Sequence, residues 1–121
     1  MDATGQRTER RGSASVSDDN YHFLVRPDEL PSGKSRCFEV AGHPVLLCHT
    51  RDGFFAVHNI CTHAYARLDE GRLRGNRVIC PLHGASFDVR DGAVKGQPAH
   101  ESLRSYPLRV TDDAVEVLIE D

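Results

Sequence analysis

Two short segments of the chain each place a cysteine and a histidine within a few residues of each other. They are Cys61-Thr62-His63 and Cys80-Pro81-Leu82-His83. Sixteen residues, 64–79, separate them, which is enough for the chain to run out to a surface turn and return as a second strand, so that the two loops face each other. Two thiolates and two imidazoles suit a [2Fe–2S] centre in which the sulfur ligands hold one iron and the nitrogen ligands hold the other.

The same four residue types also admit a zinc site or a purely structural role. A Cys2His2 zinc site usually has a cysteine pair followed by a histidine pair, whereas the order here is Cys, His, Cys, His. In the structural interpretation, Cys61 and Cys80 are buried apolar residues or form a disulfide. That interpretation requires a coincidence of spacing in both segments, together with Pro81 and Gly84 in the second. The iron–sulfur interpretation is favoured, and a zinc-stabilised binding module remains an alternative.

The residues that follow each segment strengthen the iron–sulfur interpretation. The first segment continues as Ala64-Tyr65-Ala66-Arg67-Leu68-Asp69-Glu70-Gly71, and the second as Gly84-Ala85-Ser86-Phe87-Asp88. Both stretches resemble the motifs of the soluble Rieske ferredoxins that serve bacterial aromatic-ring-hydroxylating dioxygenases. Residues 96–99 are similar to the proline loop that covers the cluster in that family, and 106–110 to the strand that follows it. The resemblance covers about residues 21–119.

The resemblance implies a ligand set and a function. Cys61 and Cys80 are expected to hold the inner ferric iron of one Rieske [2Fe–2S] cluster, and His63 and His83 the outer iron through Nδ1. No residue is expected to be catalytic. The chain is expected to carry single electrons from an NAD(P)H reductase that contains FAD to a terminal non-haem iron oxygenase of aromatic hydrocarbon catabolism. The alternative is a Rieske-like small subunit of an enzyme complex such as assimilatory nitrite reductase.

The chain departs from the high-potential Rieske proteins of respiratory complexes. Those proteins brace the cluster with a disulfide and donate hydrogen bonds to its sulfurs from a serine and a tyrosine; the matching positions here are Ala66, Leu82, Ala85 and Phe87. Because such hydrogen bonds stabilise the electron-rich reduced state, their loss lowers the reduction potential. We expect a potential near the low end of the Rieske range, about −150 mV.

Length and composition limit what else the chain can be. Its 121 residues, 39% of them hydrophobic, allow one domain with one modest core and leave no room for a second, catalytic domain. No apolar run approaches the ~20 residues needed to cross a bilayer, and no apolar segment follows Arg10-Arg11 as an export signal requires. We expect a soluble, cytoplasmic protein in which Cys37 and Cys48 are reduced packing residues. A net charge of −3 argues against nucleic-acid binding.

The residue pattern predicts an all-β fold. Residues 1–20 are polar and are expected to form a flexible tail, and 21–121 to form one Rieske [2Fe–2S] domain whose two loops make a cluster-binding subdomain at about 58–88. Strand-like runs occupy 21–25, 36–40, 44–49, 54–58 and 115–119, between turns at Asp52-Gly53, Asp91-Gly92 and Asp112-Asp113. One helical turn is expected at 28–30. Such short strands predict a small antiparallel sandwich or partly open barrel.

Two further groups of residues bear on partners and additional sites. The arginines between the ligand pairs, with Asp69 and Glu70, are typical of a solvated hairpin face, with a docking patch as the alternative; they are Arg67, Arg72, Arg74 and Arg77. The remaining histidines, His22, His43, His49, His58 and His100, have no second ligand at metal-like spacing and are expected to be surface residues of strands or loops.

The expected partners are met in turn. Because a carrier contacts the reductase and then the oxygenase, we expect a monomer whose contacts are transient and below roughly 1,200 Å², with no binding to membrane or nucleic acid. Electrons are expected to leave through the imidazole edges of His63 and His83. Partners are then expected to dock over the cluster tip, where Tyr65, Leu82 and Pro98 provide apolar contacts.

Overall fold

The chain forms three antiparallel β-sheets in a computed structural model that describes residues 20–62, 65–82, 84–97, 99 and 101–120. The strands are β2 Tyr21–Val25, β3 Ser35–Val40, β4 His43–Thr50, β5 Gly53–His58, β6 Arg72–Arg74, β7 Arg77–Ile79, β8 Ser86–Asp88, β9 Val94–Gly96, β10 Ser105–Tyr106, β11 Leu108–Val110 and β12 Val115–Leu118. Two short 3₁₀ helices, η2 Pro27–Glu29 and η3 Leu68–Glu70, interrupt them. The expected all-β antiparallel fold is confirmed; the expected flexible tail lies outside the described residues.

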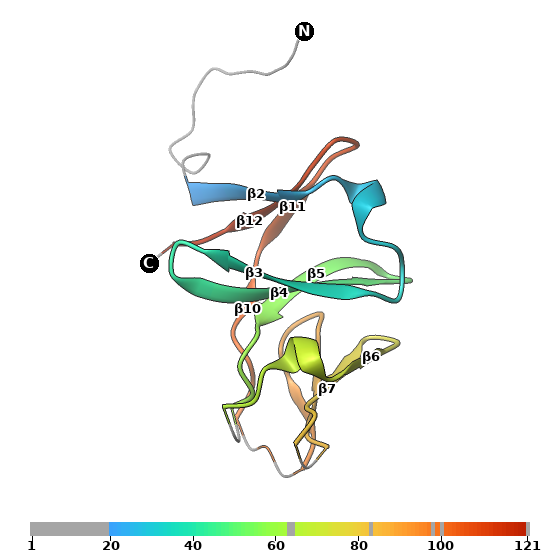
Figure 1. The fold of residues 1–121 in the computed structure, drawn as a ribbon, viewed down its shortest axis with the longest axis vertical. Helices are drawn as coiled ribbons and strands as arrows, with labels where there is room; N and C mark the ends of the chain where they lie inside the picture. Colours follow the sequence, from blue (N-terminus) through green and yellow to red (C-terminus); the bar gives the residue numbers. More distant parts are fainter. Residues whose placement is uncertain (1–19, 63–64, 83, 98, 100, 121) are drawn as a thin grey trace, which may run out of the picture.

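The sheets are stacked in the order that Figure 1 shows. The sheet β11-β12-β2 lies at one end, the sheet β10-β5-β4-β3 in the middle, and the sheet β6-β7-β8-β9 at the other end, beside the loops that carry the ligand segments. The end of β12 and the start of β2 lie far from those loops. The ligand segments therefore occupy one tip of the molecule.

The middle sheet is buried on both faces, which explains its most apolar strand. Four consecutive β4 residues, 45–48, have no exposed surface. Because side chains alternate along a strand, Leu46 and Cys48 pack in the core beside the ligand loops, whereas Val45 and Leu47 pack in the core shared with β2 and β12. An unbroken apolar run is thus the pattern of a strand between two layers.

Proline 107 divides a segment that the sequence presents as one strand. Residues 106–110 were expected to form a single strand, but β10 ends at Tyr106 and pairs with β5, while β11 begins at Leu108 and pairs with β12. Proline has no N–H to donate to a sheet. The Pro107 carbonyl still accepts a hydrogen bond from Leu118 N at 2.9 Å. The chain therefore passes from the middle sheet to the end sheet at this residue.

Other boundaries differ from the expectation by a residue or two. The helical turn expected at 28–30 is the 3₁₀ helix Pro27–Glu29, whose Glu29 side chain accepts a hydrogen bond from Arg26 N at 2.8 Å. The pattern at 115–119 ends as a strand at Leu118, although Ile119 N still donates to Asn20 O. No described helix has the length and apolar character needed to span a membrane.

Three of the histidines are not simple surface residues. His43 and His58 both direct Nδ1 at the Tyr106 hydroxyl, at 3.2 and 3.3 Å, and Arg104 lies over the Tyr106 ring. One hydroxyl can donate to one imidazole and accept from the other, so both contacts can be hydrogen bonds at the same time. His49 is half-buried, bonded to Leu30 O at 2.6 Å and stacked on Phe54. These three histidines lie on strands, as expected, but they are partly buried and hydrogen-bonded rather than fully exposed.

The buried environment of His58 predicts a pH-dependent stability. Burial, with His43 and Arg104 nearby, lowers the pKa of His58 below its ordinary value. The unfolded chain then binds a proton more readily, so stability is fully present above about pH 6.5 and is lost as pH falls through the depressed folded value. We expect His58→Gln to reduce the fall in melting temperature between about pH 8 and pH 5.5. Equal falls for wild type and variant would contradict this account.

Candidate metal centre

The two ligand segments fold into loops that are closed in the same way. Cys61 N donates to Ala66 O at 2.9 Å, and Cys80 N donates to Ala85 O at 2.7 Å. Each hydrogen bond therefore joins a cysteine to the alanine five positions later and encloses one histidine of the pair. The two loops are a structural repeat that the sequence presents only as two unequal Cys-His spacings.

The backbone is left-handed at the same position of each loop. The residue four positions after each cysteine has a positive φ, which is +53° at Tyr65 and +77° at Gly84. The left-handed region is open to glycine but disfavoured for most other residues. The second loop meets this requirement with a glycine, and the first loop does not.

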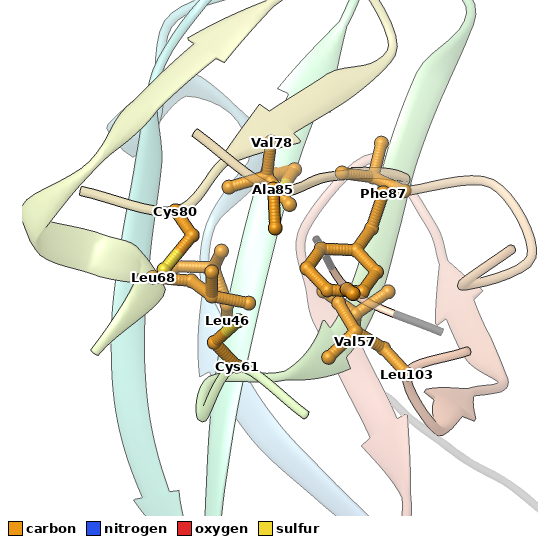
Figure 2. Packing of buried hydrophobic residues seen from close by; sticks show 12 residues of the cluster. Leu46, Val57, Cys61, Leu68, Val78, Cys80, Ala85, Phe87 and Leu103 are labelled. Atoms are coloured by element: carbon orange, nitrogen blue, oxygen red, sulfur yellow. The ribbon is translucent and has the colours of Figure 1, made fainter. Parts of the chain in front are cut away.

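The cysteines of the two loops come together in the core. Cys61 and Cys80 are each 2% exposed and lie at one end of a cluster of apolar side chains, with Leu68 and Leu46 beside them, as Figure 2 shows. Burial raises the pKa of the Cys80 thiol, a backbone hydrogen bond from Leu82 lowers it, and the adjacent Cys61 thiol raises it. The two sulfurs are thus close enough to interact and compete for negative charge, which a shared cationic centre would relieve.

The first loop is held by a buried asparagine that sequence reasoning missed. Asn59 has no exposed surface, its Nδ2 donates to Asp69 Oδ1 at 2.8 Å, and its Oδ1 accepts from Asp69 N at 2.9 Å. Its backbone carbonyl also accepts from Leu68 N at 2.7 Å. Burial alone would raise the pKa of Asp69, but hydrogen bonds from Asn59 and Arg67 hold it below its ordinary value. Asn59 and Asp69 therefore fasten the start of the loop to η3; only their proximity to Cys61 could have signalled this role.

Two further contacts involve the ligand loops. One lies between Gly71 and the second loop, and the other joins the first loop to the segment that follows β9. A Cβ at Gly71 would overlap the carbonyl oxygen of Ile79 and lie 3.1 Å from Pro81 Cδ, so glycine allows the chain after η3 to approach the second loop. Thr62 Oγ1 donates to Glu101 O at 2.8 Å. This bond attaches the first loop to the chain just after residues 96–99, which were expected to resemble the proline loop. Pro98 itself lies outside the described residues.

Cys37 and Cys48 are free thiols on strands of the middle sheet, as expected. Cys48 has no exposed surface, and burial raises its pKa to about 12. Burial, with Asp69 nearby, raises the pKa of Cys37 as well. Cys48 is therefore a packing residue of the core, and the raised pKa values favour the thiol over the thiolate at both positions.

The arginines between the two ligand segments are not equivalent. Arg67 Nη2 lies 3.0 Å from Asp69 Oδ2, and its Nε lies 3.8 Å from Glu70 Oε2, so its charge is compensated by neighbours. Arg72 and Arg74 are exposed, and no carboxylate of the described residues lies within ion-pair distance of them. With Lys34 they line a basic groove of about 410 Å³ between the η2–β3 loop and β6. The uncompensated positive charge lies there and not at Arg67.

The described donors fit a cluster that takes two of its ligands as cysteine sulfurs. Two buried thiols meet at the start of paired loops, inside an apolar shell that includes Leu68 and Ala85. The expected nitrogen ligands, His63 and His83, fall within the same loops but lie outside the described residues. The two buried thiols match the cysteine half of the mixed ligation of a Rieske centre.

Comparisons with a family model, with related sequences and with solved structures all identify Rieske [2Fe–2S] proteins as similar to this chain. A model of the Rieske [2Fe–2S] domain matches residues 20–107. The anthranilate 1,2-dioxygenase ferredoxin subunit of Burkholderia cepacia is 37% identical over 97 residues, which are 80% of this chain and 90% of that protein. The ferredoxin of carbazole 1,9a-dioxygenase from Nocardioides aromaticivorans IC177 superposes with a TM-score of 0.80 at 31% identity, covering 84% of this chain and 99% of that one. A ferredoxin solved in complex with the oxygenase of carbazole 1,9a-dioxygenase gives 0.78 at 28% identity, covering 82% and 93%.

Proposed function

The chain belongs to the Rieske [2Fe–2S] domain family and holds one such cluster, and we propose that Cys61, His63, Cys80 and His83 are its ligands. The observation that carries this assignment is the meeting of two buried cysteines at the start of two identically closed loops. Each loop then contributes one sulfur and one nitrogen ligand. We also assign residues 21–121 to one domain, with the cluster-binding part at about 58–88.

The protein is an electron carrier of an aromatic dioxygenase system and is not catalytic on its own. Its relatives are named as ferredoxin components, which favours this function over a small subunit of a nitrite reductase and over a zinc module. The cluster supplies reversible one-electron chemistry. The polypeptide has three other roles. It must bury the cysteine ligands, leave the histidine ligands accessible to partners, and provide a surface on which the partners bind.

We propose that electrons enter and leave at the tip formed by the two loops. Cys61 and Cys80 are covered by the core, so neither sulfur can itself be the contact point for a partner. Tyr65 and Leu82, in the same loops, are exposed apolar residues. The donor is proposed to be a flavin reductase using NAD(P)H, and the acceptor a terminal non-haem iron oxygenase. The carrier is proposed to be a cytoplasmic monomer that meets them in turn.

The low reduction potential expected from the sequence remains part of this proposal. Ala85 and Phe87 have no exposed surface and no side-chain hydroxyl, so at these two positions only the backbone N–H groups can donate hydrogen bonds to the cluster. Leu82 already supplies one such backbone hydrogen bond to Cys80. A potential of about −150 mV fits a carrier between a flavin and an oxygenase.

Electron transfer to a terminal oxygenase tests the function directly. The protein is reduced with dithionite, desalted anaerobically and mixed with oxidised terminal oxygenases encoded by the same organism. Oxidation of the carrier should accompany reduction of one of them. Arg72→Glu should slow this step several-fold at low salt and little at high salt, because a charge at the rim of an interface acts mainly on the encounter rate.

The matched control reverses a charge at the opposite end of the molecule. Glu120→Lys, exposed just beyond β12, should leave the rate near wild type. Arg67 is unsuitable for this test because its reversal would also remove the ion pair with Asp69. Equal sensitivity at Arg72 and Glu120 would place electron exit on another face. Failure to reduce any terminal oxygenase would contradict the proposed function itself.

A further inference from the structure

A tyrosine occupies a backbone conformation that the fold otherwise gives to glycine in the ligand loops. Tyr65 has φ +53°, while Gly84 takes the equivalent position of the second loop with φ +77°. Glycine, asparagine and aspartate adopt the left-handed region readily, whereas an aromatic residue is strained there. A strained residue beside a metal site suggests a functional reason for keeping it.

Packing within the molecule does not explain the tyrosine. Tyr65 is 92% exposed, the highest value among the exposed large apolar side chains. Within the described part of the chain its ring makes no stacking or cation–π contact, although such contacts occur at Tyr21 and Tyr106. Its backbone N–H donates to Cys61 O at 3.3 Å, a bond that any residue other than proline could make. The side chain therefore contributes little to the folded monomer.

The position of Tyr65 is next to the proposed route of electrons. It follows His63 by two residues, and Leu82, which is 47% exposed, directly precedes His83. The other large exposed apolar residues are on the distant end sheet, Phe23 on β2 and Val110 on β11. Each ligand loop thus carries one large exposed apolar residue at the tip, Tyr65 in the first loop and Leu82 in the second.

We propose that Tyr65 is the aromatic anchor by which the carrier binds its terminal oxygenase, and that the strained conformation is retained because it presents the ring to that partner. This inference rests on the proposed function. A tyrosine offers a large, rigid contact with only two side-chain torsions to order, which is why such residues dominate many interfaces. The oxygenase is the partner chosen because a similar ferredoxin has been solved in complex with one.

The test uses a substitution whose effects on stability and on transfer should have opposite signs. Asparagine tolerates the left-handed region, so Tyr65→Asn should raise the midpoint of thermal unfolding by a few degrees. The same variant should lose about tenfold in kcat/KM for oxygenase reduction, as expected for removal of an interface anchor. The loss should appear in KM, with kcat and the EPR spectrum of the cluster close to wild type.

Two matched variants separate the anchor from general effects. Tyr65→Phe keeps both the ring and the strain, and should preserve the wild-type KM and melting midpoint. Phe23→Asn removes an exposed aromatic ring from β2, away from the tip, and should leave KM unchanged. Reduction of each variant by a flavin reductase is measured in parallel.

The outcomes are distinct. An unchanged KM for Tyr65→Asn would overturn the inference, and so would a lowered melting midpoint, because the ring would then be structural. Slower reduction by the reductase with normal transfer to the oxygenase would also overturn it, since the anchor would serve the other partner. If wild type reduces no oxygenase while Tyr65→Asn is more stable, the proposed function fails and the strain assignment stands.

Discussion

Protein in which Cys80 is replaced by serine is expected to be purified without a [2Fe–2S] cluster, and Cys61→Ser to behave in the same way. The two cysteines are buried beside each other in the core, where solvent has little access to replace a lost sulfur ligand. A serine hydroxyl is a poor substitute for a thiolate in iron–sulfur ligation. The measurement is iron and acid-labile sulfide per chain after anaerobic purification, together with the visible spectrum.

Cys48→Ala is the matched control because the chain offers a cysteine of equal burial in the same core. Cys48 has no exposed surface, and its thiol remains protonated since burial raises its pKa to about 12. Its replacement should cost about 1–3 kcal/mol of stability and keep the full cluster content. A cluster that survives in Cys80→Ser, or is lost in Cys48→Ala with the fold intact, would show that the ligands are assigned wrongly.

Loss of Asn59 is expected to cost about 2–4 kcal/mol of stability and to accelerate release of the cluster. Asn59→Ala leaves Asp69 N and Asp69 Oδ1 without their partner at the base of the first loop, although Asp69 Oδ2 keeps its bond to Arg67. Unsatisfied groups at a buried position destabilise the fold, and the loop that carries Cys61 and His63 loses its attachment to η3. Chemical denaturation and the bleaching rate of the cluster with a chelator measure the two effects.

Asn76→Ala provides a control with the same chemical change. Asn76 Nδ2 donates to Asp52 Oδ2 at 2.6 Å in a more exposed setting, away from the cysteines. We expect it to cost about 0.5–1.5 kcal/mol and to leave the bleaching rate unchanged. If Asn59→Ala bleaches at the wild-type rate, Asn59 supports the fold but does not position the ligand loop.

The parts of the fold that follow from local pattern could be predicted. The alternation at 21–25 and the apolar run at 44–49 predicted β2 and β4 correctly. A strand buried on one face alternates apolar and polar residues, and a strand buried on both faces is apolar throughout, so both patterns are visible in the sequence. The division at Pro107 was missed, since it depends on which sheet each half pairs with. Register and sheet exchange are tertiary properties that a run of residues does not specify.

At the candidate site, too, the residue types could be predicted from the sequence and the contacts between them could not. The spacing of Cys61 and Cys80 relative to the histidines indicated the cofactor, since it is carried by residue type alone. The function of Asn59, the neutralisation of Arg67 by Asp69 and the strain at Tyr65 could not be predicted. Each depends on contacts or a backbone angle that only the folded loops create.

Iron and sulfide analysis combined with EPR of the dithionite-reduced wild type tests the central claim most directly. The account predicts about two irons and two sulfides per chain, and an EPR signal whose average g lies below 2 with hyperfine coupling to histidine nitrogen. Stoichiometric zinc without iron after anaerobic preparation, or a reduced signal with no nitrogen coupling, would contradict it.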